Sequence, residues 1–411
     1  MELWSRRPDK LDAMGILDDD LCAALDRLER ESLRRNLRVV GGAHGPRVEI
    51  GGRNVLMLSS NNYLGFAAHP ALKHAAIEAI GRFGVGAGAS RLIAGSLAPI
   101  HDLEERIARF KHVEAALVFG AGYLANIGAI SSMAGAGDEI FSDELNHASL
   151  IDGCRLSRAA VRIFRHRDLE HLAELLKESH GAHRRLIVTD SVFSMDGDLA
   201  PLVEIVELAR RYRAAVMIDE AHAIGIVGPN GAGLAAKLGL EREVDIHVGT
   251  LSKALGSYGA YVAGSRALID FLINRARSFI FSTGLPPAMA AAAHAAIDLI
   301  ESEPASIERL WDNAEYFRGE LIASGFTIAP TATPIIPVMV GDSAAALKMS
   351  AALLEQGVYV IAIRPPTVPK GTARLRVTPI ASHSRADLDE AIAAFVAAGR
   401  AVGLIGANGR A

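Results

Sequence analysis

The residues of this chain best suited to chemistry lie where short apolar runs end in polar side chains. Lys253 follows one such run, Ile246 to Val248, and glycines and small residues come after it. Burial among small residues lowers the pKa of an ammonium group, so the free amine becomes available as a nucleophile. A lysine in this setting suits a carbonyl-bearing cofactor held as a Schiff base. A single Ser-x-Lys motif, however, more often belongs to a solvated loop.

A carboxylate and a histidine follow a second apolar run. Asp219 ends the run Met217-Ile218, and His222 comes three residues later. A buried carboxylate needs a partner, and the protonated nitrogen of a heteroaromatic ring is one. His222 would then donate a hydrogen bond to a phenolate oxygen on the same ring. Taken alone, an Asp-x-x-His motif is more often a helix cap.

Two further motifs occupy equivalent positions. The turn Gly120-Ala121-Gly122-Tyr123 comes between a predicted strand and a predicted helix, where free N–H groups and the helix dipole form an anion site. His147 also follows a predicted strand, so it would lie over a bound ring or transfer a proton. Many such turns bind no ligand, and a histidine that faces solvent is an equally good interpretation of the second motif alone.

Hydroxyl and guanidinium groups complete the candidates. The hydroxyls of Ser191 and Ser194, in the segment SVFSMDGD, either face a ligand or cap a turn. Arg364 leaves a predicted strand within a proline-rich segment and is suited to bind a carboxylate, although an ordinary surface arginine is the alternative. The glycine-rich segment 84–95 is either a flexible loop or a backbone that approaches another surface closely.

The joint occurrence of these motifs changes their interpretation. Asp219, His222 and Lys253 follow successive predicted strands, and the anion-binding turn lies upstream. Pyridoxal 5'-phosphate (PLP) requires this combination: a lysine for its aldehyde, an acid for its pyridine nitrogen and a helix N-terminus for its phosphate. The sequence therefore predicts a PLP site.

Alternating helices and strands would position these residues. Between residues 99 and 218, short strands that are apolar on both faces alternate with helices. This pattern predicts an α/β fold with a doubly wound, mainly parallel sheet, whose ligands gather at the carboxyl ends of the strands. We expect an arm helix over residues 16–40 and a small ribbon in residues 1–58, a large cofactor domain at 59–303 and a smaller α+β domain at 304–411. In the last domain, residues 358–363 are expected to form one strand.

Composition limits the class of protein. The chain has 411 residues, a net charge of −4 and two cysteines. These values predict a soluble cytoplasmic protein that has no disulfide framework and does not bind nucleic acid. No stretch resembles a signal peptide or a membrane span, so no membrane association is expected, and no metal site is predicted.

From about residue 25 to residue 383, the sequence resembles the α-oxoamine synthases among the fold-type I PLP enzymes. The motifs that carry the resemblance are NNYLG (61–65), LNHASLIDGCRLS (145–157), SVFSMDGD (191–198), IDEAHAIGIVG (218–228), TLSKALGSYGAYVAGS (250–265) and FSTGLPP (281–287).

The resemblance implies a role for each matching residue. Lys253 would form the Schiff base, Asp219 would pair with the pyridine nitrogen, and His147 would stack on the ring. His222 would bind the phenolic oxygen. Further contacts to the cofactor or its phosphate would come from Gly122, Tyr123, Ser194, Thr250 and, in the neighbouring subunit's site, Thr283. The substrate contacts would be Arg35, with Arg34 as competitor, and Asn61, Arg364 and Thr367.

The resemblance also implies a reaction. A PLP-dependent acyltransferase of this family condenses an amino acid with an acyl thioester and releases carbon dioxide. Residues 363–378 and 281–288 favour L-alanine and a pimeloyl thioester, which would place the reaction in biotin biosynthesis. The alternatives are glycine with acetyl-coenzyme A, serine with a long acyl chain, or a non-catalytic subunit on the same fold. A homodimer with shared sites is expected, with the 84–95 loop completing the partner's site.

Overall fold

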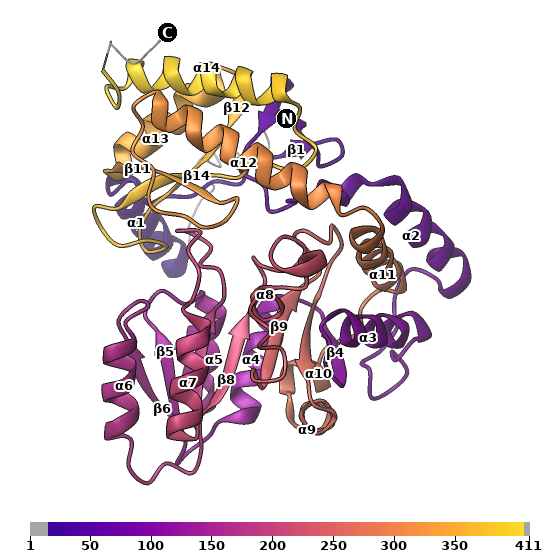
Figure 1. The fold of residues 1–411 in the computed structure, drawn as a ribbon. Coiled ribbons are helices and arrows are strands. Elements are labelled where there is room, and N and C mark those ends of the chain that lie inside the picture. Colours follow the sequence, from indigo (N-terminus) through magenta and orange to yellow (C-terminus); the bar gives the residue numbers. More distant parts are fainter. Residues whose placement is uncertain (1–14, 407–411) are drawn as a thin grey trace.

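The computed structural model describes residues 15–406, which form a large α/β unit and a smaller unit that contains the C-terminal helices (Figure 1). The large unit contains a seven-stranded sheet in the order β4-β10-β9-β8-β7-β5-β6. Its strands are β4 (Ala115–Phe119), β5 (Glu139–Asp143), β6 (Ala160–Phe164), β7 (Arg185–Asp190), β8 (Ala215–Asp219), β9 (Ile246–Thr250) and β10 (Ala260–Gly264).

The sheet is parallel except at β10, which is antiparallel to both of its neighbours. Successive residues of a strand enter different apolar clusters: Val216 and Ile218 belong to one, and Met217 belongs to the other. A core on each face explains why the strands are apolar throughout. The predicted α/β fold with a mainly parallel sheet is confirmed.

Helices cover both faces of this sheet (Figure 1). The helices of the large unit are α2 (Pro70–Phe83), α3 (Ala98–Phe110), α4 (Gly122–Met133), α5 (Ala148–Ser157), α6 (Leu169–Glu178), α7 (Leu202–Tyr212), α8 (Leu234–Leu238), α9 (Arg266–Arg275), α10 (Arg277–Ile280) and α11 (Pro287–Ser302), with short 3-10 turns at Phe66–Ala68 and Pro229–Gly231. Helices α8, α9 and α10 were not predicted from the sequence. Within residues 15–406, no helix has the length and hydropathy needed to cross a bilayer.

The smaller unit combines both ends of the described chain. Its helices are α12 (Ala305–Ala323), α13 (Ser343–Glu355) and α14 (Arg385–Ala401), and its antiparallel sheet consists of β11 (Ile336–Gly341), β14 (Ala373–Val377) and β13 (Ile361–Ile363). The N-terminal ribbon of β1 (Val40–Gly41), β2 (Arg47–Ile50) and β3 (Arg53–Met57) pairs with β12 (Val358–Tyr359), in parallel through β3. Leu56 and Leu58 share one apolar cluster with Phe317 and Phe395.

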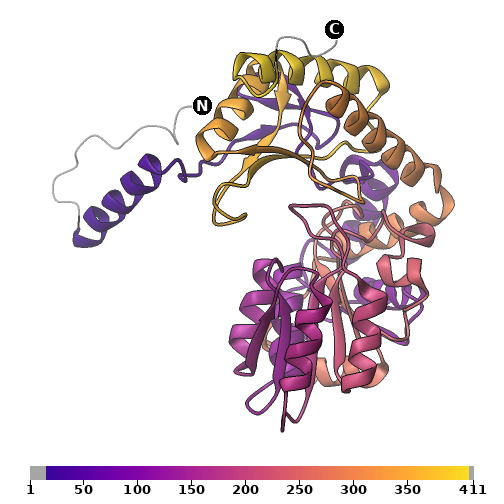
Figure 2. The same ribbon diagram turned by 60° about the vertical axis from the view of Figure 1, so that its left-hand side comes forward.

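Two predicted elements differ from the structure. The arm helix α1 (Ile16–Arg30) ends ten residues before the expected position, and residues 33–39 are not helical. The helix ends because Ser32 adopts a positive φ of 55°, which a continuing α-helix does not accommodate. The expected strand 358–363 is divided between two sheets, since β12 pairs with the ribbon and β13 with β14. Figure 2 shows α1 standing away from both units.

Candidate active site

The carboxyl ends of the parallel strands bring most of the predicted residues to one edge of the large sheet. Asp190, Asp219 and Thr250 are the last residues of β7, β8 and β9, and Lys253 follows three residues after β9. Neighbouring parallel strands end at the same edge. Residues more than 60 positions apart in the sequence therefore lie close together.

Lys253 is the end of a chain of hydrogen bonds. Its Nζ atom lies 2.7 Å from Nε2 of His222, and Nδ1 of His222 lies 2.7 Å from the hydroxyl of Tyr63. That hydroxyl also accepts a hydrogen bond from Arg376, at 3.1 Å. Neither Tyr63 nor Arg376 was predicted as a site residue, although Arg376 is a charged residue on a buried strand, which is itself a signal of function.

The environment of Lys253 favours the uncharged amine. Burial, with a further contribution from Arg376, lowers the pKa of Lys253 to about 8, against the opposing effect of Asp219 and Asp190. Burial, together with the charge of Lys253, also lowers the pKa of His222 well below its ordinary value. A neutral His222 beside a lysine of reduced basicity provides a nucleophilic amine near neutral pH.

Asp219 is a buried carboxylate whose partners keep it in place. One oxygen accepts a hydrogen bond from Nδ2 of Asn126 at 2.7 Å, and the other accepts one from the backbone N–H of Ala221 at 2.8 Å. Asn126 also donates to Oγ of Ser149, at 2.9 Å. Neither Asn126 nor Ser149 was predicted as a site residue from the sequence. The signal for Asn126 is a single amide side chain within the small-residue helix α4.

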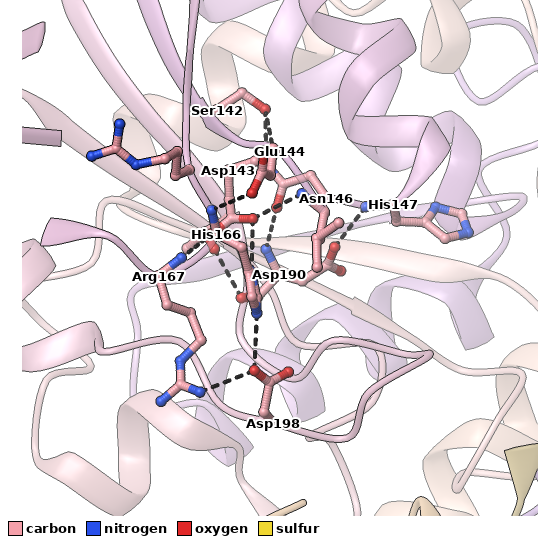
Figure 3. A network of polar contacts seen from close by, with 12 residues as sticks. Ser142, Asp143, Glu144, Asn146, His147, His166, Arg167, Asp190 and Asp198 are labelled. Carbon is pink, nitrogen blue, oxygen red and sulfur yellow. Dashed lines mark hydrogen bonds and ion pairs between the residues drawn. The ribbon is translucent and has the colours of Figure 1, made fainter. Parts of the chain in front are cut away.

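His147 is at the start of α5, beside these groups. Its Nδ1 atom lies 2.7 Å from Oγ of Ser149. Its backbone N–H donates to Oδ2 of Asp190 at 2.7 Å (Figure 3). Burial, assisted by the charge of Lys253 and opposed by the charge of Asp219, lowers the pKa of the His147 imidazole. Burial and the charge of Asp219 raise the pKa of Asp190 well above its ordinary value.

Backbone N–H groups at the start of α4 provide an anion site. The N-cap residue is Ala121, which has no side chain that could accept a hydrogen bond from the first turn. The first helical N–H groups, at Gly122 and Tyr123, are therefore available to an anion. The hydroxyl of Tyr123 donates to Asp152. Thr250 Oγ1 lies 2.7 Å from Oγ of Ser252.

The 191–200 loop reaches the same site from β7. The carbonyl of Ser194 accepts a hydrogen bond from Nε of Arg376 at 2.5 Å, and Arg376 also donates to Oδ1 of Asn61 at 3.1 Å. Ser191 Oγ donates to the carbonyl of Asp219 at 2.9 Å. Of the predicted residues, Asn61 and Ser194 thus meet at Arg376.

Arg364 meets the arm segment. Its guanidinium donates to the carbonyls of Ser32 and, at 3.5 Å, Arg34. Arg35 donates to the carbonyl of Pro365 at 3.4 Å, and burial together with the charge of Arg35 lowers the pKa of Arg364. Thr367 is exposed, and its backbone N–H donates to the carbonyl of Arg364 at 3.1 Å.

Arg34, the predicted competitor of Arg35, forms an ion pair with Glu29 at 3.6 Å. Neither Arg35 nor Arg364 has a carboxylate partner within residues 15–406. Two close guanidinium groups of this kind are suited to bind a carboxylate.

Thr283 lies elsewhere, against the glycine-rich loop. It forms an isolated antiparallel bridge with Ser90, and Gly284 donates its N–H to the carbonyl of Ala89 at 3.0 Å. A Cβ atom on Gly284 would come within 2.5 Å of the carbonyl oxygen of Gly95, so glycine is required for this approach. Among the described residues, no hydrogen bond links the Thr283 side chain to Lys253, His222 or Asp219.

The donors and acceptors of this site fit PLP. Lys253 offers an amine of lowered pKa, Asp219 a buried carboxylate, and α4 an uncapped N-terminus for a phosphate. Together with the seven-stranded sheet, they define a PLP-dependent enzyme of fold-type I.

Comparison with known proteins agrees with this class. A family model described as aminotransferase class I and II matches residues 53–395. A relative from Geobacter sulfurreducens named 8-amino-7-oxononanoate synthase is 51% identical over 387 residues, which cover 94% of this chain and 99% of the relative.

Two solved structures show the same fold. A variant serine palmitoyltransferase from S. paucimobilis with bound PLP–myriocin aldimine has a TM-score of 0.90 and 35% identity, and the match covers 95% of this chain and 100% of that one. An 8-amino-7-oxononanoate synthase from Francisella tularensis has a TM-score of 0.73 and 26% identity, with 84% and 98% covered. The chain belongs to the aminotransferase class I and II family and, within it, to the α-oxoamine synthase group, and its cofactor is PLP.

Proposed function

We propose that this protein condenses L-alanine with a pimeloyl thioester, giving 8-amino-7-oxononanoate, carbon dioxide and free coenzyme A or carrier thiol. The observation that carries the proposal is the nearly full-length match, at 51% identity, to a relative named for this reaction. The protein is accordingly a PLP-dependent acyltransferase of biotin biosynthesis. The site geometry supports the proposal because it offers a nucleophilic lysine, a buried acid and paired arginines.

PLP supplies an aldehyde that binds an amino group and a ring that accepts electrons from the adjacent carbon. Lys253 would hold the cofactor through its amine and, once alanine has displaced it, would take the proton from the Cα atom of alanine. His222, 2.7 Å from the amine, would keep Lys253 in place for this transfer. After the acyl group has been added and carbon dioxide lost, the same amine would return a proton to that carbon.

Asp219 and His147 would hold the ring of the cofactor. The Asp219 carboxylate, fixed by Asn126 and Ala221, would accept a hydrogen bond from the pyridinium N–H and thereby maintain its charge. The neutral ring of His147 would stack on the pyridine face. Phosphate would bind at the N-terminus of α4 through Gly122 and Tyr123, with Ser194, Thr250 and the partner's Thr283 nearby.

The paired arginines would bind the carboxylates of the substrates. We assign Arg364 to the carboxylate of alanine and Arg35 to the acyl substrate, whose pimeloyl chain ends in a second carboxylate. Asn61 and Thr367 would line the same pocket. An acetyl or palmitoyl thioester has no terminal carboxylate, so a cationic pocket favours the pimeloyl group.

A homodimer forms part of the proposal, because the family resemblance assigns the 84–95 loop and Thr283 to the site of a second copy. The cytoplasm is the proposed location, which agrees with two free cysteines. A non-catalytic subunit is disfavoured by the retained lysine and its partners.

One observation favours a second candidate, a serine palmitoyltransferase-like activity: the match to that enzyme has the higher TM-score of the two structures above, 0.90 against 0.73. The decisive experiment incubates the PLP-loaded protein with L-alanine and pimeloyl-coenzyme A and identifies the product by mass spectrometry. We expect 8-amino-7-oxononanoate, coenzyme A and carbon dioxide in equal amounts.

The same assay with glycine or serine, and with acetyl-, succinyl- or palmitoyl-coenzyme A, measures specificity, and pimeloyl-carrier protein tests the other carrier. Greater kcat/KM for serine with palmitoyl-coenzyme A than for alanine with pimeloyl thioesters would reject the proposal in favour of the second candidate.

A further inference from the structure

His166, which lies beyond the site residues described above, bridges two carboxylates. It follows β6, and its Nδ1 and Nε2 atoms lie 3.0 Å from Asp143 Oδ1 and 2.9 Å from Asp198 Oδ2 (Figure 3). Ionised carboxylates only accept hydrogen bonds. With both carboxylates ionised, each ring nitrogen of His166 donates a hydrogen bond to one of them, and the ring is then an imidazolium between two anions.

The surroundings of His166 support this charge state. Burial opposes protonation, but the hydrogen bonds and charges of Asp143 and Asp198 raise the pKa of His166 to about 9. The ring packs edge-on against Phe193, with centroids 4.4 Å apart. Arg167 donates to the same Asp198 oxygen at 3.0 Å. The His166 ring is therefore held by Asp143, Asp198 and Phe193.

Asp198 belongs to the 191–200 loop, and the opposite side of this loop is held by the smaller unit. Arg376 donates to the Ser194 carbonyl, and Arg374 forms an ion pair with Asp196. Thr331 and Thr333 donate to the Gly197 carbonyl at 3.0 and 2.9 Å. From the large unit, His166 holds the loop through Asp198. The loop is therefore fixed between the two units.

The other carboxylate, Asp143, organises the turn that leads to His147. Asp143 Oδ1 accepts a hydrogen bond from the N–H of Leu145 at 2.9 Å. Asn146 then donates to the carbonyl of Val188 and accepts from the N–H of Asp190. One imidazolium thus connects the turn carrying His147 to the loop that carries Ser194.

We propose that His166 is a positioning residue that fixes the 191–200 loop and, through it, Arg376 and the Tyr63–His222–Lys253 chain. The inference deepens the proposed function, on which its catalytic part rests. Arg376 contacts the Ser194 carbonyl, Asn61 Oδ1 and the Tyr63 hydroxyl, so a displaced loop would release one of the three contacts of that guanidinium.

The first test measures the amide exchange of the 191–200 loop directly, in cofactor-free protein. In His166→Gln, hydrogen–deuterium exchange should be at least 10-fold faster at the amides of Phe193 and Gly197, whose N–H groups bond within the loop at 3.0 and 2.7 Å. Amides of β7 should keep the wild-type rate. Substitution of the exposed His180 by Gln is the matched control, and it should change the exchange rate of neither the loop nor β7.

A second variant keeps the proposal testable if His166→Gln does not fold. Asp198→Asn keeps the shape of the side chain but removes its charge, and it should accelerate exchange in the same loop. Unchanged loop exchange in both folded variants would overturn the proposal.

The effect of His166 on catalysis is measured as turnover per PLP-loaded site. We expect His166→Gln to retain the absorbance band of bound PLP and to lower kcat about 10-fold, because Arg376 is less well ordered. A variant with normal turnover per loaded site and only a reduced yield of folded protein would make His166 purely structural and reject the positioning role. If wild-type protein makes no 8-amino-7-oxononanoate, the proposed function fails, but the exchange experiment still decides how the loop is held.

Discussion

At the residue scale, the chemistry depends on how far burial suppresses the charge of Lys253. The free amine attacks the PLP aldehyde, whereas the ammonium does not. Because burial, assisted by Arg376, lowers the pKa of Lys253 to about 8, the rate of PLP attachment to cofactor-free protein should rise with pH and level off above about 8. Stopped-flow absorbance measures this rate. A rate that still rises steeply near the ordinary lysine pKa of 10.5 would contradict the buried environment, and Lys253→Ala should show no attachment.

Arg34 and Arg35 are adjacent, but their surroundings differ, which makes each a control for the other. Arg35 lies beside Arg364 and has no carboxylate partner among the described residues, while Arg34 pairs with Glu29. We expect Arg35→Ala to raise KM for pimeloyl-coenzyme A about 10-fold or more, since a charged hydrogen bond contributes about 1.5–3 kcal/mol. Arg34→Ala should change KM less than about 3-fold. Steady-state kinetics decide, and the reverse order would assign the acyl contact to Arg34.

The sequence allowed prediction of site residues that follow strands, because parallel strands end at one edge whatever the details of packing. Asp219, His222 and Lys253 are of this kind. It did not allow prediction of partners that come from distant elements, such as Asn126 for Asp219 or Arg376 for Tyr63. Those contacts depend on how α4 and β14 pack, which local patterns do not specify.

At the element scale, the same distinction between local patterns and contacts with distant elements explains which parts of the fold were predictable. The strands of the large sheet were predictable because each is a short apolar run, and between residues 99 and 218 these runs alternate with helical segments. The division of 358–363 into β12 and β13 was not predictable, since the two halves differ only in which distant strand they pair with. The end of α1 depends on a left-handed Ser32, a residue type without a strong preference for that conformation.

A buried ionic cluster connects β8, β9 and α3. Lys111 Nζ lies 2.5 Å from Glu220 Oε2, His247 Nδ1 lies 3.3 Å from the same oxygen, and all three side chains are fully buried. Glu220→Gln would leave Lys111 as a buried charge without a counterion. We expect it to lower the free energy of unfolding by about 3–5 kcal/mol, measured by urea denaturation of cofactor-free protein.

The double substitution Lys111→Met/Glu220→Gln is the matched control for this cluster. It removes both charges, so it should recover most of the lost stability; a double variant as unstable as Glu220→Gln would show that the loss has another cause. Burial opposes ionisation of Glu220, but Lys111 and His247 lower its pKa to about 2. This depressed pKa gives stability that is present above the ordinary value of 4.5 and lost as the pH falls through about 2.

At the scale of the whole molecule, large apolar side chains are exposed around the segment that holds Thr283. Val85 and Ile93 are 77% and 80% exposed, and Phe281 is 71% exposed. The bridge between Ser90 and Thr283 joins the two segments that carry them. Exposed apolar groups gathered in this way mark an interaction surface, and the proposed homodimer would cover it.

Mixing two inactive variants tests whether the two copies share their sites. Thr283→Asp would place a carboxylate against the phosphate of the partner's PLP, and Lys253→Ala removes the nucleophile, so each homodimer should be inactive. If Thr283 serves the partner's site, a mixed dimer contains one site with both native residues and one with both defects. Equal amounts exchanged to equilibrium give half mixed dimers, hence roughly one quarter of wild-type activity. Ser282→Asp is the control for a charge at the neighbouring position, and size-exclusion chromatography with light scattering checks that every variant is a dimer. If Thr283 acts within its own chain, every mixed dimer lacks one native group at each site, and mixing restores no activity.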